Sequence, residues 1–294
     1  MNMDRTKFLG ASEIPAVLGL SPFKSPLDVF LEKTGRLVQN PPTIQMRAGN
    51  FLEPLVIELF EEETGIQVVN KQAHLTLQDH PFISATIDGE TLDGCLVECK
   101  TTGSSEGWGE PGTDQVPDHI LVQVVQQMAV SDKGVVWIPV LIGRNDFRIY
   151  RIGRDLELEK IVVARGVEFW EKHVLADVPP EPRTIADLKA LFPTSKVIAK
   201  EATPEIREKI ATIKQLRDDI NAREGVEKTL LFGVQAYMGE ADTLTFGGKT
   251  IATWKSQERT TIDQKALKEA HPQIAMVVSK TTTSRVFRLS SSKE

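Results

Sequence analysis

Cysteine and histidine are scarce in this chain of 294 residues. Only Cys95 and Cys99 supply thiols. Two thiolates are too few for an iron–sulfur cluster, and a structural zinc site would need histidines to complete it. His74, His80 and His119 do not have the spacing of metal ligands. The composition therefore sets iron–sulfur and structural zinc proteins aside.

Long apolar runs are also missing. No stretch approaches the roughly eighteen apolar residues of a membrane-spanning helix, and the first ten residues lack the apolar region of a signal peptide. The two cysteines agree with a reducing compartment, where both stay thiols. We therefore expect a cytoplasmic protein that has no membrane partner.

Charge is spread unevenly along the chain. Residues 1–180 carry 16 Lys and Arg against 26 Asp and Glu, whereas residues 181–294 carry 19 against 15. The first part is thus acidic, at −10, and the second mildly basic, at +4. An acidic domain can still act on nucleic acid if its carboxylates bind cations in a cleft, because the cations reverse the local sign.

The spacing of apolar residues predicts helices at the start of the first part, followed by strands and two further helices. Apolar residues at helical spacing predict helices over 12–20, with Ser12 as a cap, and over 25–35 and 46–65, with Pro54 in the opening turns of the last. Alternation predicts strands over 66–70, 73–77, 82–89, 95–100, 134–143 and 146–152. Further helices are expected over 117–134 and 156–170. We predict an α/β core over residues 1–178, with a mixed central sheet flanked by helices.

A proline-rich linker over 177–184 follows the predicted core, and residues 179–294 are expected to form a C-terminal extension. Isoleucines and leucines spaced by three and four predict a long amphipathic helix or helical hairpin over 203–239. Short strands are expected over 248–256 and 284–290. The extension should therefore be helical with a small β part.

The stretch GCLVECK, residues 94–100, places two charges at the end of an apolar strand. Residues two apart on a strand share a face, so Glu98 and Lys100 should point the same way. Asp88 lies ten residues before Glu98, across a plausible hairpin turn at residues 91–94. An E-x-K triplet alone is common on solvated strands, but burying these charges would be costly without a partner. Two acids and a lysine together predict a divalent-metal site beside a fixed cation.

Hard oxygen ligands favour Mg²⁺, for which Mn²⁺ can substitute. Such an ion keeps several waters and binds phosphate oxygens, so it can activate water and stabilise the leaving oxygen. Lys100 could orient the attacking water and bind a non-bridging oxygen. The chemistry indicated is hydrolysis of a phosphodiester bond.

These residues resemble a known family. The order Glu53, Asp88, Glu98, Lys100 is similar to the PD-(D/E)xK nuclease superfamily, and segments within residues 9–130 resemble the YqaJ family of phage recombinases, relatives of lambda exonuclease. The matching segments are GASEIPAVLGLSPFKSPLDVFLEKTG, MRAGNFLEPLVIELFEEETG, ATIDGE, LVECKTT and VPDHILVQVVQQMAV. The resemblance departs at Ile87, where the superfamily name expects proline before the aspartate. The resemblance implies a restriction-endonuclease-like core.

The resemblance also implies roles for individual residues. Metal ligands would be Asp88, Glu98, the backbone carbonyl of Cys99 and, directly or through water, Glu53. Lys100 would be the catalytic lysine and Gln123 the glutamine beside the site. A terminal 5′-phosphate would be held by Arg5, Ser12 and Thr86. The residues alone leave Glu53 open as a polar helix position, Gln123 as a solvated glutamine, Arg5 as a disordered residue and Ser12 as a simple cap.

The function expected from this resemblance is a Mg²⁺-dependent deoxyribonuclease. It would digest one strand of duplex DNA from a 5′ end and leave a single strand for phage-type recombination. A homotrimer, a single-strand annealing partner and a bacterial or phage-infected host cell are implied in the same way. Two alternatives stay open: an endonuclease that uses the same site without a DNA end, and a DNA-binding or assembly module with an idle site.

Overall fold

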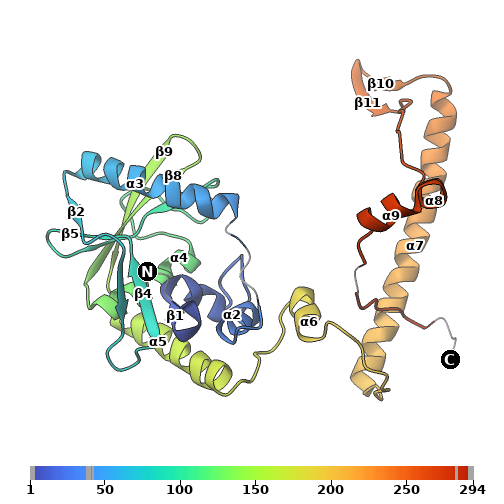
Figure 1. Cartoon of the computed structure of the whole chain (residues 1–294). Helices are drawn as coiled ribbons and strands as arrows, with labels where there is room; N and C mark the ends of the chain where they lie inside the picture. The colour runs from blue at the N-terminus through green and yellow to red at the C-terminus, as the bar shows by residue number, and fades with distance from the viewer. Residues whose placement is uncertain (1–3, 38–40, 42, 282–283, 291–294) are drawn as a thin grey trace. The chain divides into compact units, whose positions relative to one another are not determined.

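The computed structural model describes residues 4–37, 41, 43–281 and 284–290, and divides the chain into two compact units (Figure 1). Unit 1 is Met1–Leu191 and unit 2 is Phe192–Glu294. Unit 1 contains two sheets and most of the helices, whereas unit 2 is built on one long helix. The units are therefore described one at a time.

The larger sheet of unit 1 has the order β2-β5-β6-β8-β7, and β9 pairs with β8. Pairing is mixed: β6 and β7 run parallel to β8, while β5 is antiparallel to β6 and β9 to β8. Its strands are β2 (Val68–Val69), β5 (Gly89–Thr91), β6 (Leu96–Val97), β7 (Lys100–Thr102), β8 (Val135–Ile142) and β9 (Asp146–Gly153). The mixed central sheet expected from the sequence is confirmed.

A second, three-stranded sheet has the order β1-β4-β3. It contains β1 (Leu9–Gly10), β3 (Ala73–Thr76) and β4 (Ile83–Ile87). Strand β4 ends one residue before Asp88 and β5 begins one residue after it. Asp88 therefore lies where the chain passes from one sheet to the other.

Helices flank these sheets and supply the core. They are η1 (Arg5–Lys7), η2 (Ala11–Glu13), α1 (Ile14–Val17), α2 (Pro26–Lys33), α3 (Ile44–Thr64), α4 (Asp118–Ser131), α5 (Leu156–Phe169), η3 (Trp170–Leu175) and α6 (Ile185–Leu191). Helix α4 buries nine of its fourteen residues, and it packs on β4, β8, α1 and α5. Apolar residues of α4 and β8, such as Val124 and Ile138, are fully buried in the core.

Two local predictions for the helices are wrong. Pro54 lies in the middle of α3, where its missing N–H removes one intrahelical hydrogen bond, and the helix begins earlier, at the Thr43 cap. Ser12 does not cap a helix, because it lies inside η2, for which Gly10 is the N-cap. The capping acceptor is instead the Glu13 side chain, which receives the Gly10 N–H at 2.9 Å.

Unit 1 extends past the boundary that the sequence placed at residue 178. Asp187 of α6 is 2% exposed and accepts hydrogen bonds from the Ser25 hydroxyl at 2.8 Å and the Arg183 N–H at 2.8 Å. Ser25 is the N-cap of α2, so this carboxylate ties residues 183–187 to the first helices. The structure divides after Leu191 because these contacts hold the proline-rich segment to unit 1.

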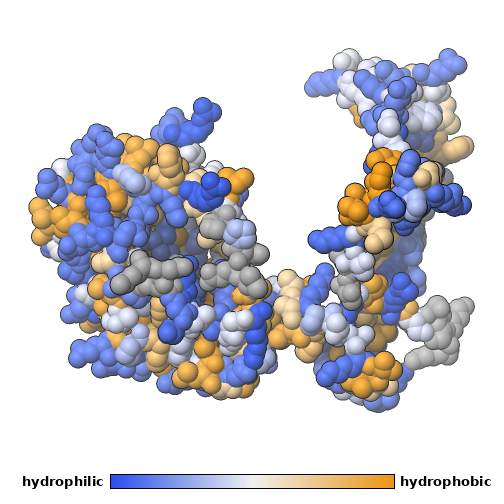
Figure 2. All heavy atoms as spheres, viewed as in Figure 1, coloured by the Kyte–Doolittle hydropathy of each residue, from blue (hydrophilic) through white to orange (hydrophobic). Residues whose placement is uncertain are grey.

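Unit 2 contains α7 (Pro204–Met238), the hairpin β10 (Thr243–Phe246) and β11 (Lys249–Thr253), α8 (Gln264–Ala270) and α9 (Pro272–Val278). The predicted long helix is confirmed, with Thr203 as its cap. Residues 284–290 are not a strand, and β11 pairs with the unpredicted β10 instead. Apolar surface is exposed around α9 (Figure 2). Within the described ranges of both units, no helix has the length and apolar character needed to cross a membrane.

Candidate active site

Asp88 and Glu98 are brought together by the pairing of β5 with β6. Gly89 lies opposite Val97, so the residue before β5 and the residue after β6 are neighbours. The predicted strand over 95–100 is interrupted at Glu98 and Cys99, between β6 and β7. This break lets the Cys99 N–H donate to Asp88 Oδ2 at 2.8 Å, and the same peptide segment therefore orients one acid and carries the other.

Glu98 is buried, at 4% exposure, and both of its oxygens are hydrogen-bonded. Oε1 accepts from Lys100 Nζ at 2.6 Å and from Gln123 Nε2 at 2.6 Å. Oε2 accepts from Gln127 Nε2 at 2.6 Å. A buried carboxylate is stable only when such donors replace water, and here helix α4 provides two of them.

Lys100 completes the cluster from strand β7. Its Nζ lies 2.6 Å from Glu98 Oε1 and 3.1 Å from Gln123 Oε1. Burial alone would lower the pKa of Lys100, but the attraction of Glu98, its hydrogen bond and the field of Asp88 raise that pKa above its usual value. Lys100 is therefore a fixed cation and hydrogen-bond donor at neutral pH.

Asp88 shows the electrostatic cost of placing acids together. Burial is the main reason that its pKa is raised well above the usual value, and repulsion from Glu98 and Glu53 adds to this, while Lys100 opposes it. Burial likewise raises the pKa of the Cys99 thiol, with further repulsion from Asp88 and Glu98. A cation bound between the carboxylates would relieve this repulsion.

Glu53 reaches the edge of the cluster from α3. Its Oε1 accepts from Gln72 Nε2 at 2.6 Å, and the Gln72 N–H donates to the Asp88 carbonyl at 3.4 Å. Gln72 has a positive φ of 60°, which turns this loop back toward Asp88. Glu53 therefore lies close enough to influence the pKa of Asp88, and Gln72 is its direct partner.

The donor set fits a magnesium-like ion held by few protein ligands. Among the described residues, no group of three or more His, Cys, Asp and Glu side chains could hold a metal ion together. Mg²⁺ commonly binds one or two carboxylates and keeps waters or phosphate oxygens as its other ligands. The Asp88 and Glu98 carboxylates, with the Cys99 carbonyl between the strands, match that requirement.

Arg5, Ser12 and Thr86 are all exposed, on η1, η2 and β4 respectively. The Thr86 hydroxyl lies 3.3 Å from His74 Nδ1, and its carbonyl accepts from Gln127 Nε2 at 3.3 Å. No hydrogen bond joins the three side chains to one another in the described part of the chain. The elements bearing Ser12 and Thr86 are nevertheless neighbours, because η2 packs on β4.

Sequence reasoning missed two glutamines of α4 and the loop residue Gln72. Gln127 is 1% exposed and binds Glu98, while Gln126 is fully buried and donates to the Leu9 and Ser84 carbonyls at 3.1 and 2.9 Å. Three glutamines within five positions of an apolar helix were the available signal, since a buried amide needs partners. Gln123, which was predicted, does contact both Glu98 and Lys100.

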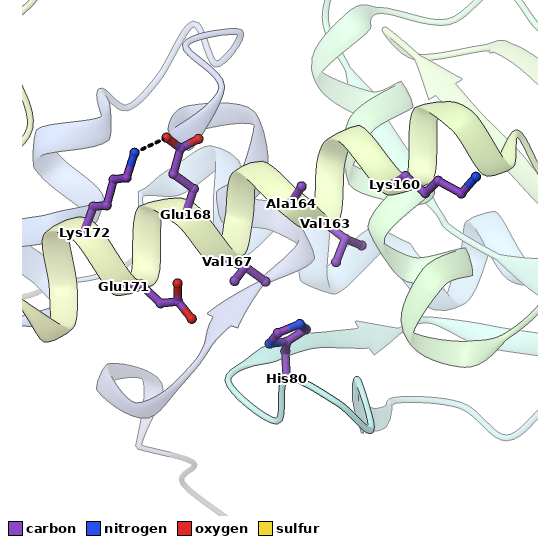
Figure 3. A pocket seen from close by; sticks show the side chains of 8 residues that line it. All are labelled: His80, Lys160, Val163, Ala164, Val167, Glu168, Glu171 and Lys172. Atoms are coloured by element: carbon purple, nitrogen blue, oxygen red, sulfur yellow. Dashed lines mark hydrogen bonds and ion pairs between the residues drawn. The ribbon is translucent and has the colours of Figure 1, made fainter.

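Two hollows of unit 1 are lined by residues outside the carboxylate cluster. One, of about 550 Å³, lies between His80 and α5, where Val163 and Val167 form an apolar wall beside the Glu168–Lys172 ion pair of 2.7 Å (Figure 3). Another, of about 370 Å³, is lined in part by His119, whose pKa is lowered by burial and by the charge of Lys100. The candidate site is therefore identified from its carboxylates and Lys100, and the second hollow adjoins it at His119.

Comparison with known proteins identifies the family. Residues 2–134 match the YqaJ-like viral recombinase domain. Protein YqaJ of Bacillus subtilis (strain 168) is 30% identical over 97% of this chain and 92% of its own length. The relationship thus includes unit 2 as well as the matched domain.

Solved structures agree on the fold. The crystal structure of LHK-Exo in complex with dAMP superposes with a TM-score of 0.50 at 20% identity, covering 59% of this chain and 91% of that one. A second structure, the alkaline exonuclease LHK-Exo from Laribacter hongkongensis, gives a TM-score of 0.49 over the same shares. The match to LHK-Exo in complex with dAMP agrees with the predicted α/β core, a mixed sheet flanked by helices, as the fold class. The full-length relative and the matched domain show that the chain belongs to the YqaJ-like viral recombinase family.

Proposed function

We propose that the protein is a Mg²⁺-dependent deoxyribonuclease that digests duplex DNA from a 5′ end and leaves single-stranded tails for recombination. The observation that carries the proposal is the cluster of the buried Glu98 with the half-buried Asp88 and Lys100, in which Gln123 and Gln127 hold Glu98. Family membership and the alkaline exonuclease neighbours support it.

In this proposal the metal supplies an activated water and charge stabilisation at phosphorus. Asp88, Glu98 and the Cys99 carbonyl would hold the ion, and Glu53 would bind it directly or through water. Lys100 donates hydrogen bonds to the attacking water or to a non-bridging oxygen, since it stays protonated. Gln123 and Gln127 keep the Glu98 carboxylate in one orientation, as outer partners of metal ligands do.

End recognition is the finer part of the proposal. Arg5, Ser12 and Thr86 would bind the terminal 5′-phosphate, for which a guanidinium and two hydroxyls are suitable donors. A homotrimer around the duplex and a single-strand annealing protein as partner belong to the same proposal. Mn²⁺ is expected to replace Mg²⁺.

The decisive experiment compares linear 5′-phosphorylated duplex with covalently closed circular DNA, in Mg²⁺, Mn²⁺ and EDTA. We expect digestion of the linear DNA with either metal, no digestion in EDTA and survival of the circle. Cutting of the circle would favour the endonuclease that uses the same site, and digestion in EDTA would contradict metal dependence.

Lys100→Met tests the chemistry itself. Removing a fixed donor to developing charge lowers rates by roughly 10²–10³-fold, so a loss of this size is expected. Lys133→Met is the matched control, because Lys133 is a lysine of the same unit that pairs with Glu90, at 3.2 Å, rather than with Glu98. Unchanged activity of Lys100→Met would instead support a DNA-binding or assembly module with an idle site.

A further inference from the structure

Lys33 and Glu13 form a buried ion pair outside the carboxylate cluster. Lys33 Nζ lies 2.6 Å from Glu13 Oε2, and the two side chains are 1% and 9% exposed. Lys33 is the last residue of α2, and Glu13 ends η2. The pair therefore links two elements that are far apart in the sequence.

Within the described ranges, the other side-chain hydrogen bonds of this pair go to the segment Arg5–Glu13. Lys33 Nζ donates to the Arg5 carbonyl at 2.7 Å and lies 5.7 Å from the centre of the Phe8 ring. Glu13 Oε2 accepts the Gly10 N–H at 2.9 Å. The two charges thus hold the backbone of this segment at two points and contact a ring between them.

Stability alone does not explain such a pair. Burial lowers the pKa of Lys33, and Glu13 only partly offsets this, which reflects the cost of removing the ammonium from water. Apolar residues of similar size often replace a buried ion pair without loss of stability. What they cannot replace is the directed hydrogen bonding that fixes the backbone at Arg5 and Gly10.

The outer side of the same segment carries Arg5 and Ser12, which are exposed. The segment is also fixed to the strand that carries Thr86, because Leu9 pairs with Ile83 and Gly10 with Ser84 in parallel register. Gln126 donates to carbonyls of both strands, and Lys33 binds the segment from α2. The backbone bearing both exposed side chains is therefore held on two sides.

We propose that the Lys33–Glu13 ion pair is a positioning device that holds Arg5 and Ser12 in the arrangement needed to receive the 5′-phosphate of a DNA end. The inference rests on the end recognition proposed above. Neither Lys33 nor Glu13 touches the DNA in this scheme. Their effect is on which ends bind, because misplacing a binding group by about 1 Å can cost about 10²-fold.

The test uses the full chain and the double variant Glu13→Gln/Lys33→Met. The amide oxygen of the glutamine introduced by Glu13→Gln can still accept the Gly10 N–H, and no unpaired charge stays buried. Initial rates are measured on duplexes with a 5′-phosphate or a 5′-hydroxyl. We expect KM for the phosphorylated end to rise roughly tenfold or more, while kcat on saturating DNA stays unchanged.

Two further variants make the result specific. Arg154→Met removes a partly buried ion pair with Glu159, 2.6 Å long, that does not contact the segment, and it should leave the end preference intact. Glu13→Gln alone keeps an amide oxygen as an acceptor but leaves the Lys33 ammonium buried without its counter-charge; it should shift the same preference in the same direction, measured against the same variant's rate on the 5′-hydroxyl end. A drop in melting temperature without a change in end preference would overturn the inference.

These variants also distinguish the positioning role of the Lys33–Glu13 pair from the 5′-phosphate recognition on which it rests. If the wild-type protein ignores the 5′-phosphate, or Arg5→Ala keeps the preference, the end recognition fails and the positioning role fails with it. If Arg5→Ala loses the preference while the double variant and Glu13→Gln both keep it, the end recognition stands and only the positioning role is overturned.

Discussion

The two units differ most in how their apolar residues are used. In unit 1 the strands and α4 bury most of their apolar side chains, and Ile138 and Val124 are fully buried. In unit 2 the apolar residues of α7 are largely exposed: Leu216 and Ile220 are each 54% exposed. Among the described residues, Met238 and Ala275 are the buried apolar side chains of unit 2.

The difference in burial between the two units determines where a charged side chain can be held in a fixed position and protonation state. A buried ion such as Glu98 must be held by directed donors, so its position and protonation are fixed by the fold. On α7 the Lys209–Glu205 pair is 2.6 Å long, but both side chains are mostly exposed, so it contributes about 0–1 kcal/mol. The comparison supports unit 1 as the location of the proposed nuclease chemistry.

The largest expected effect comes from truncating a core residue. Ile138→Ala, at a fully buried position of β8, should lower the free energy of unfolding of unit 1 by about 2–5 kcal/mol. Ile220→Ala, the same change on α7, should cost less than about 0.5 kcal/mol in monomeric protein. Urea denaturation followed by circular dichroism measures both. Equal losses would show that the exposed face of α7 is covered in solution.

A smaller effect is expected from the amide that holds Glu98. Gln127→Leu leaves Glu98 Oε2 without its donor, so the Mg²⁺ concentration for half-maximal activity should rise about 10–100-fold. Gln235→Leu, at an exposed glutamine of α7, is the control and should change nothing. The midpoint for each variant is measured by following DNA digestion over a range of Mg²⁺ concentrations. An unchanged midpoint for Gln127→Leu would remove this residue from the metal site.

The smallest effect compares two aspartates at helix amino ends, Asp187 in the first turn of α6 and Asp263 at the N-cap of α8. Burial disfavours the Asp187 carboxylate, but hydrogen bonds from the Arg183 N–H, Ser25 and Thr184 more than offset it, so the pKa of Asp187 is lowered. Asp187→Asn should cost about 1–2 kcal/mol at neutral pH. Asp263→Asn, at the exposed cap of α8, should cost almost nothing, since asparagine caps equally well.

The pH dependence of the Asp187 effect follows from the lowered pKa. The stabilising form is the carboxylate, which is fully present above the unfolded-state value of about 4 and is lost as the pH falls through the folded value. The difference between Asp187→Asn and wild type should therefore shrink below about pH 4. Denaturation curves at several pH values measure this, and a difference that stays constant with pH would contradict it.

Local sequence patterns were enough to predict much of the nuclease-like core. The alternation of residues 82–89 and 134–143 matched β4 and β8, and the spacing of Asp88 to Glu98 implied their meeting across a turn. These predictions succeeded because side-chain direction in paired strands follows from position alone. Lys100 followed from the same alternation and Gln123 from the family resemblance, and both side chains contact Glu98.

Contacts between distant segments could not be predicted in this way. The Ser25–Asp187 hydrogen bond joins residues 162 positions apart, so the end of unit 1 was placed too early. Gln127 and Gln72 were not predicted as site residues, because only the folded backbone turns them toward Glu98 and Glu53. Pairing of β10 with β11 was missed since neither strand is buried enough to alternate clearly.

Pro54 separates α3 into an exposed amino-terminal half and an anchored carboxy-terminal half. The C-terminal half is anchored by Val56, Ile57 and Phe60, whereas the residues before Glu53 are mostly solvent-facing. With no amide at position 54, the Asn50 carbonyl has no intrahelical donor, so the ladder is weakest one turn before the anchored half. Fraying that starts at the amino end of α3 can therefore stop before the anchored half. Glu53, at the edge of that half, would then keep its hydrogen bond with Gln72 while the preceding turns unwind.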